Sequence, residues 1–67
     1  MEVAVEHIWQ QVATVLRSEG WMVGWAEYAD LQAERVWLAQ AVRNGVVEES
    51  DGTDLDDALA NLYCLTR

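Results

Sequence analysis

The chain has 67 residues, of which twelve are Asp or Glu and four are Arg, and its formal net charge at pH 7 is −8. A charge of this sign repels nucleic acid and anionic lipid and favours basic protein surfaces, so the composition argues against direct DNA binding. The length predicts one domain, residues 1–67, and a domain of this size buries only about 60% of the surface of its unfolded chain.

The composition nevertheless favours a folded protein. Hydrophobic residues make up 52% of the chain, four of them are Trp, and Pro is absent. The single Cys64 excludes an internal disulfide. No hydrophobic run is long enough to cross a membrane and no basic, apolar leader is evident, so we expect a cytoplasmic protein without a membrane partner.

An amphipathic helix is predicted over residues 3–19. Its apolar positions recur at helical spacing, and they are Val5, Ile8, Trp9, Val12, Val15 and Leu16. Gly20 is placed to end this helix, because glycine readily adopts the left-handed conformation found at helix ends.

A second helix is predicted over residues 24–44. Trp25, Tyr28 and Ala29 follow helical spacing after a turn that contains Gly20 and Gly24. The helix either runs unbroken or restarts with Asp30 as its cap, and Asn44 and Gly45 supply its end.

The last predicted helix covers residues 54–65. Asp51 and Gly52 form a turn signal, Thr53 or Asp54 can cap the helix, and the apolar stripe consists of Leu55, Ala58, Leu59 and Leu62. The sequence therefore predicts an all-α fold, a small bundle of three helices, or four if the middle one breaks at Asp30. A short hairpin near residues 46–54 is the alternative for the connecting loop.

Neither catalytic nor cofactor chemistry is indicated. The only His, His7, lies on the polar face of the first helix, and Cys64 projects away from the apolar stripe of the last helix. The acids around Gly52 lack the spacing of a calcium-binding EF-hand loop. We expect no enzyme activity, no cofactor and no metal.

The run AVRNGVVEESDGT, residues 41–53, resembles the end of a winged helix-turn-helix recognition helix followed by a strand and a wing. DNA-binding members of that family usually carry Arg or Lys in this stretch, whereas this chain carries Glu48, Glu49 and Asp51. The resemblance implies a copy that has lost DNA binding and acts as a protein-binding module.

Six of the twelve acids lie between Glu48 and Asp57. Asp54, Asp56 and Asp57 fall in the first turn of the last predicted helix, where the helix dipole stabilises each by about 0.3 to 1 kcal/mol. Glu48, Glu49 and Asp51 have no such explanation and repel one another.

A second acidic group is predicted on the middle helix. Glu27, Asp30 and Glu34 share one helical face if that helix is continuous, and their spacing along it is of the same order as that of phosphates. The candidate partner-binding surface combines them with the acids of the later stretch, which are Glu48, Glu49, Asp51, Asp54, Asp56 and Asp57.

Two tryptophans are candidate interface anchors. Trp37 lies among polar residues by helical phase and Trp21 lies in a turn, so each is predicted to anchor a homodimer or a target protein. Partial burial at the edge of the core is the alternative for both.

A short, helical, Trp-rich and strongly acidic chain without catalytic motifs resembles the small phage-encoded inhibitors that imitate DNA, the anti-CRISPR proteins among them. The resemblance implies a non-enzymatic inhibitor in the bacterial cytoplasm that binds the basic surface of a CRISPR effector complex or another DNA-binding protein. The alternative is a regulatory interaction module, such as a dimeric helix-turn-helix relative that does not bind DNA.

Overall fold

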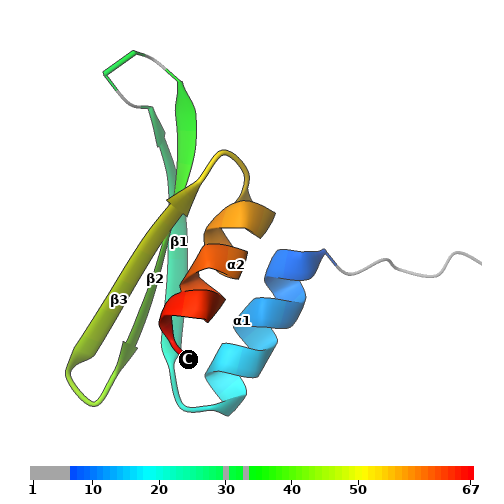
Figure 1. The fold of residues 1–67 in the computed structure, drawn as a ribbon, viewed down its shortest axis with the longest axis vertical. Coiled ribbons are helices and arrows are strands. Elements are labelled where there is room, and N and C mark those ends of the chain that lie inside the picture. The colour runs from blue at the N-terminus through cyan, green and yellow to red at the C-terminus, as the bar shows by residue number, and fades with distance from the viewer. Residues whose placement is uncertain (1–6, 30, 33) are drawn as a thin grey trace, which may run out of the picture.

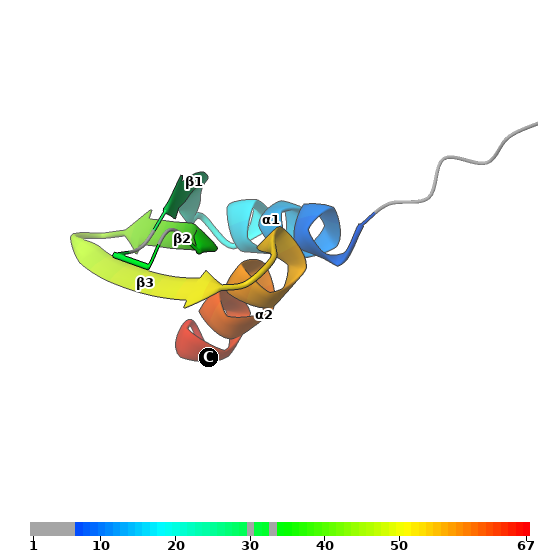
Figure 2. The same cartoon turned by 90° about the horizontal axis from the view of Figure 1, so that it is seen from above.

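The computed structural model describes residues 7–29, 31–32 and 34–67. Its elements, in chain order, are α1 (Ile8–Ser18), β1 (Met22–Ala29), β2 (Arg35–Arg43), β3 (Val46–Gly52) and α2 (Leu55–Leu65). The strands form one antiparallel sheet in the order β1-β2-β3, and both helices lie on the same face of it (Figures 1 and 2). The fold is therefore α/β, and the predicted all-α helical bundle is wrong.

The predicted middle helix, residues 24–44, is instead most of β1, a turn and all of β2. The two strands pair with Trp25 opposite Ala39 and with Val23 opposite Ala41. Trp37, Ala39 and Ala41 alternate along β2 toward the helices, which is the period of two expected of a strand. The short apolar runs fit a helical spacing only by coincidence, and β-branched and aromatic residues favour the strand.

The turn between β2 and β3 is made by Asn44 and Gly45. Both have positive φ angles, 52° and 79°, which is the signature of a two-residue type I′ hairpin turn. Asn44 and Gly45 were predicted to end a helix, and this prediction is wrong. The hairpin turn lies at these two residues and not at Asp51 and Gly52. The same finding overturns the winged helix-turn-helix resemblance, because residues 41–43 end a strand rather than a recognition helix.

The two terminal helices agree better with the sequence. Residues 54–65 were predicted to be helical and α2 spans Leu55–Leu65, with the carboxylate of Asp54 accepting a hydrogen bond from the Asp57 amide at 2.8 Å. The first helix was predicted over residues 3–19, and α1 covers Ile8–Ser18, while residues 3–6 lie outside the described residues. Gly20 follows α1 with a φ of 91°.

The core lies between the helices and the sheet. Its buried residues come from α1, the α1–β1 connection, β2 and α2, and they are Ala13, Leu16, Trp21, Ala39, Ala41, Ala58, Leu59 and Leu62. Small residues predominate where α2 crosses the sheet. A Cβ atom built on Gly52 would lie 2.5 Å from the Ala58 amide nitrogen and 2.8 Å from the Asp57 Cβ, so a side chain at this position would push α2 away from β3.

Two glycines of the sheet provide a matched test of this packing. Gly52→Ala should lower the free energy of unfolding by about 1 to 3 kcal/mol, because the added methyl meets the α2 backbone. Gly24→Ala should change it little or raise it slightly, because its Cβ would have no neighbour within 4 Å. Urea denaturation compares the two, and equal effects would show that α2 does not approach β3 this closely.

Candidate acidic interface

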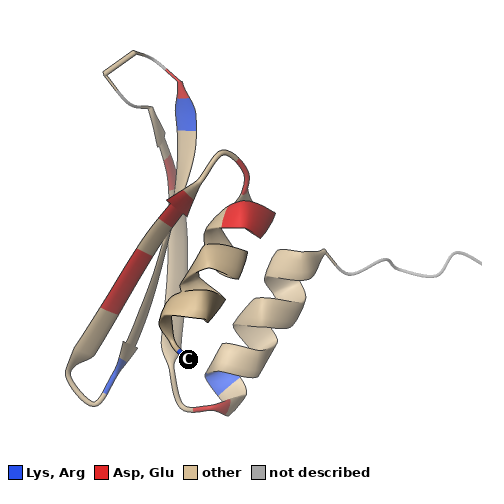
Figure 3. Ribbon diagram, viewed as in Figure 1, with Lys and Arg blue, Asp and Glu red and all other residues tan. Residues whose placement is uncertain are grey.

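The acids between residues 48 and 57 lie on the surface along β3 and at the first turn of α2 (Figure 3). We call this surface the acidic edge, and it consists of Glu48, Glu49, Asp51, Asp54, Asp56 and Asp57. Neighbouring strand residues face opposite sides of a sheet. Glu49 and Asp51 therefore project from the face that no helix covers, and Glu48, opposite Ala41, projects toward the helix side.

The three acids at the start of α2 each accept a hydrogen bond within the protein. Asp54 caps the helix, and Asp57 Oδ2 accepts a bond from the Thr53 hydroxyl at 3.2 Å. Asp56 Oδ1 accepts a bond from the Trp9 amide at 3.0 Å and so joins the start of α1 to the start of α2. These contacts and the helix dipole account for this half of the acidic edge without a partner.

The three strand acids have fewer internal contacts. The Glu49 carboxylate accepts a hydrogen bond from the side-chain amide of Gln40 at 2.8 Å. Among the residues that the structure describes, ion pairs join Arg35 to Glu27 and Arg67 to Glu19, and neither involves the acidic edge. The negative charge of the acidic edge is therefore not neutralised by an arginine of the described chain.

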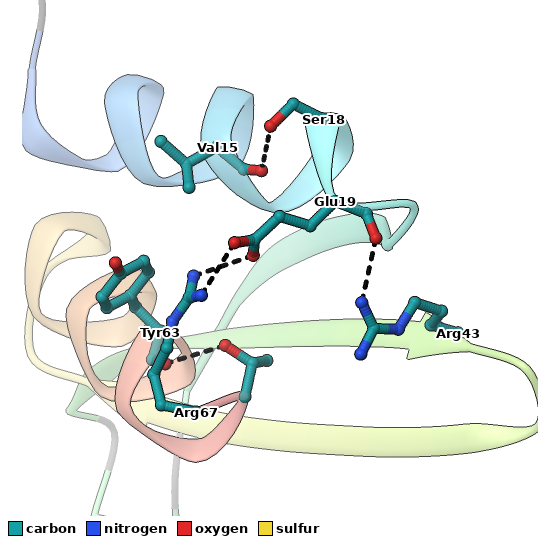
Figure 4. Close-up of polar contacts among 7 residues, drawn as sticks. Val15, Ser18, Glu19, Arg43, Tyr63 and Arg67 are labelled. Carbon is teal, nitrogen blue, oxygen red and sulfur yellow. Dashed lines mark hydrogen bonds and ion pairs between the residues drawn. The ribbon is translucent and has the colours of Figure 1, made fainter.

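Arg43 and Arg67 both bind Glu19, the residue that follows α1 (Figure 4). Arg67 holds the Glu19 carboxylate with two hydrogen bonds, 2.7 and 2.8 Å long, while Arg43 donates to the Glu19 carbonyl at 2.9 Å. The guanidinium carbons lie 3.9 Å from the Tyr63 ring for Arg67 and 4.4 Å from the Trp21 ring for Arg43. These cations stabilise the fold at the end of the molecule where α1 meets β1.

Arg17 has a comparable internal role. It donates to the Val23 carbonyl at 3.2 Å, and its guanidinium carbon lies 5.4 Å from the centre of the Trp25 ring. With Arg35 bound to Glu27, every one of the four arginines makes a contact within the protein. The molecule thus separates its charges, with Arg17, Arg43 and Arg67 near the end of α1 and the acidic edge along β3 and the start of α2 (Figure 3).

The predicted row of Glu27, Asp30 and Glu34 does not exist as a helical face. Glu27 is in β1, on the same side of the sheet as Trp25, and pairs with Arg35 at 3.1 Å. Glu34 directly precedes β2, and Asp30 lies outside the described residues. Because β2 separates β1 from β3, the structure does not join Glu27 to the acidic edge.

The two tryptophans predicted as exposed anchors face the core. Trp21 is only 6% exposed and belongs to the buried cluster, which corrects the expectation of an exposed residue in a turn. Trp37 is half-buried and packs against that cluster from β2. Partial burial, the alternative considered for these residues, describes Trp37, whereas Trp21 is a full core residue.

The uncovered face of the sheet is a feature that the helical interpretation missed. Its apolar side chains come from all three strands, and they are Met22, Ala26, Tyr28, Val36, Leu38, Val42 and Val47. Met22 is 75% exposed and Val47 is 53% exposed, and both lie in register with Val42. The signal in the sequence was the alternation of these residues with Val23, Trp25, Trp37 and Ala39. We call this surface the open face.

Side chains from the helices cover part of both edges of the sheet. Arg17 of α1 binds the Val23 carbonyl of β1, and Asn61 of α2 donates to the Asp51 carbonyl of β3 at 2.9 Å. Each contact occupies a backbone acceptor that an added strand would need. The open face is therefore more accessible to a partner than either edge.

The described part of the chain offers no metal-binding group. It holds no group of three or more His, Cys, Asp or Glu side chains that could bind a metal ion. His7 and Cys64 are both exposed, and His7 precedes the first turn of α1 whereas Cys64 lies in the last turn of α2. A groove of about 490 Å³ between α1 and β1 is lined by Trp9, Trp25 and Arg17, among others, and Arg17 already binds the Val23 carbonyl there.

Comparison with known proteins found no matching family model, no matching curated protein and no matching solved structure. The anti-CRISPR resemblance and a phage origin therefore gain no support, and the helical bundle on which that resemblance relied is wrong. None of the helices in the described residues is long and apolar enough to span a membrane.

The contact between Arg67 and Glu19 should make stability depend on pH. The hydrogen bonds from Arg67 lower the pKa of the Glu19 carboxyl below its ordinary value of 4.5. A lowered pKa in the folded state adds stability above the unfolded pKa, and this stability is lost as the pH falls through the folded pKa.

We therefore expect Arg67→Gln to be less stable than the parent protein at pH 7, and the difference to shrink as the pH falls below about 4.5. Urea midpoints measured from pH 7 to pH 3 test this. Arg67→Lys keeps the positive charge but cannot make both hydrogen bonds in the same geometry. Its urea midpoint at pH 7 should lie between those of the parent protein and Arg67→Gln. A difference that stays constant across this range would contradict the assigned contact.

Proposed function

We propose that the protein binds a basic protein surface through its acidic edge and, as a non-enzymatic inhibitor, keeps nucleic acid from that surface. One observation carries this proposal. The acidic edge has no arginine partner in the described chain, whereas all four arginines make internal contacts. Its unneutralised charge is therefore available to an external cation.

The geometry of β3 suits such a partner. Successive residues of an antiparallel strand rise about 3.4 Å, so Glu49 and Asp51, on one face, are about 6.8 Å apart along the strand. Phosphates of one DNA strand rise about 3.4 Å along the axis and are further separated by the helical rotation, so the spacing of this pair is of the same order as that of neighbouring phosphates. A cleft that binds a nucleic acid backbone can meet both carboxylates with its Lys and Arg side chains.

The rigidity of the acidic edge adds to the expected affinity. Asn61 of α2 binds the backbone of Asp51, and Ser50 donates to the Ala58 carbonyl at 2.6 Å, so β3 and α2 hold each other in place. A preformed surface loses little conformational entropy on binding. Release of counterions from the acidic edge and from the basic partner favours the complex at low salt.

A regulatory interaction module is the second candidate, and the open face favours it. Exposed apolar side chains such as Met22 and Val47 are typical of protein interfaces. In that case apolar contacts rather than charge dominate the affinity, salt has little effect, and DNA does not compete.

Two matched double variants test the proposal. Glu49→Gln/Asp51→Asn removes two charges from the acidic edge, while Glu27→Gln/Glu34→Gln removes two charges from outside it. Each protein is immobilised and exposed to a nuclease-treated bacterial lysate at low salt, and bound proteins are eluted with duplex DNA or with salt. We expect the parent and the Glu27/Glu34 variant to release the same nucleic-acid-binding proteins on addition of DNA, and the Glu49/Asp51 variant to retain about ten-fold less.

Urea denaturation serves as the control that both variants are folded. If DNA releases nothing from the parent, or if the Glu49/Asp51 variant retains as much protein as the parent, the proposed function is wrong.

A further inference from the structure

The open face is an apolar surface with acids along one side. Met22, Val42 and Val47 form one row across the three strands, and Ala26, Leu38 and Asp51 form another. Between these rows Gly24, Gln40 and Glu49 lie in register. The face thus changes from apolar on β1 and β2 to acidic on the far part of β3.

A shallow depression marks the middle of the open face. It has a volume of about 240 Å³ and is lined in part by Gly24, Ala26, Leu38 and Gln40. Gly24 contributes no side chain and Ala26 only a methyl group, whereas Met22 and Tyr28 stand at either end of β1. The depression can therefore receive a large apolar side chain from a partner.

The charge of the open face selects the partner's charge. Glu49 and Asp51 are the only charged residues that the strand register places on this face in the described chain. Arg35 and Arg43 of β2 project toward the helix side of the sheet. There Arg35 binds the Glu27 carboxylate and Arg43 binds the Glu19 carbonyl. An apolar segment with Lys or Arg along one flank complements both parts of the face.

The size of the face indicates a helix. β2 has nine residues, which at about 3.4 Å per residue extend for roughly 30 Å, or about 20 residues of α-helix. The outer strands are about 10 Å apart, which is close to the diameter of one helix. Strand addition is less favourable, because Arg17 and Asn61 already bind backbone acceptors at the two edges.

We propose that the open face binds an amphipathic helix of a partner protein. The apolar side of that helix covers Met22, Leu38, Val42 and Val47, and one of its large side chains fills the depression at Gly24. Its basic flank lies against Glu49 and Asp51. The sign of the partner's charge rests on the proposed function, whereas the apolar contact does not.

Two synthetic peptides serve as probes. The first is an 18-residue amphipathic helix of Leu and Lys, and the second replaces each Leu by Gln and keeps every Lys. Binding to the ¹⁵N-labelled protein is followed by the chemical shifts of its backbone amides. We expect the Leu/Lys peptide to shift amides of β1, β2 and β3 and to leave those in the middle of α1 unchanged, and to bind at least ten-fold more tightly than the Gln/Lys peptide.

Two further comparisons locate the contacts. Gly24→Leu should fill the depression without disturbing the core, since a Cβ there meets no atom within 4 Å, and should weaken binding of the Leu/Lys peptide at least ten-fold. Glu49→Gln should weaken it several-fold, whereas Glu48→Gln, on the same strand but facing the helix side, should have much less effect. The shifts measured on the parent protein test the inference even if Gly24→Leu is unstable.

The outcomes separate this inference from the proposed function. Equal affinity for the two peptides, or shifts confined to α2 and the acidic edge, would overturn the helix-binding inference and leave the acidic edge as the binding surface. Tight binding of the Leu/Lys peptide that is insensitive to salt and to Glu49→Gln would support the apolar contact and contradict the contact of the basic flank with Glu49, while the proposed function is decided by the elution with DNA. Shifts of the open face that disappear with Gly24→Leu and weaken with salt support both.

Discussion

Helix α2 can lie against β2 and β3 only because small residues face it at their closest approach. There is no space for a Cβ atom at position 52, because the backbone amide of Ala58 lies against Gly52. Ala39 and Ala41 are fully buried beneath the helix. This contact fixes β3 to the start of α2 and so brings the strand acids next to the helix acids, although Glu49 and Asp51 project from the opposite face of the sheet. Both helices lie on one side of the sheet, which leaves the other side without a covering element.

The distribution of charge follows from this arrangement. Arg17, Arg43 and Arg67 stabilise the end of the molecule where α1 meets β1, because the Glu19 carboxylate and the rings of Trp21, Trp25 and Tyr63 are gathered there. The ion pairs of the described residues do not include the acids of β3, which repel one another in the folded state. A partner that supplies cations would relieve this repulsion, so the acidic edge is more favourable in a complex than alone.

The two helices could be predicted from the sequence because each has a complete apolar stripe and an end signal, such as Leu55, Leu59 and Leu62 after the Asp54 cap. The sheet could not be predicted as easily, because Trp25, Tyr28 and Ala29 fit helical spacing as well as strand alternation. Asn44 and Gly45 were the decisive local signal, and they were interpreted as a helix end although the same pair favours a type I′ hairpin turn. The acids of β3 were identified as a candidate surface, but their division between two faces, and the burial of Trp21, depend on strand pairing that no short stretch of sequence encodes.

If a partner protein binds the acids of β3, its lysine side chains lie against these carboxylates in the complex. Carbodiimide cross-linking tests this contact most directly, because the reagent joins a carboxylate to a lysine amine only when the two are in contact. The complex with the protein that DNA releases is treated with the reagent and analysed by peptide mass spectrometry. We expect cross-links from Glu48, Glu49 or Asp51 to lysines of the partner's nucleic-acid-binding surface. Cross-links confined to Glu27 and Glu34, or to lysines elsewhere on the partner, would contradict it.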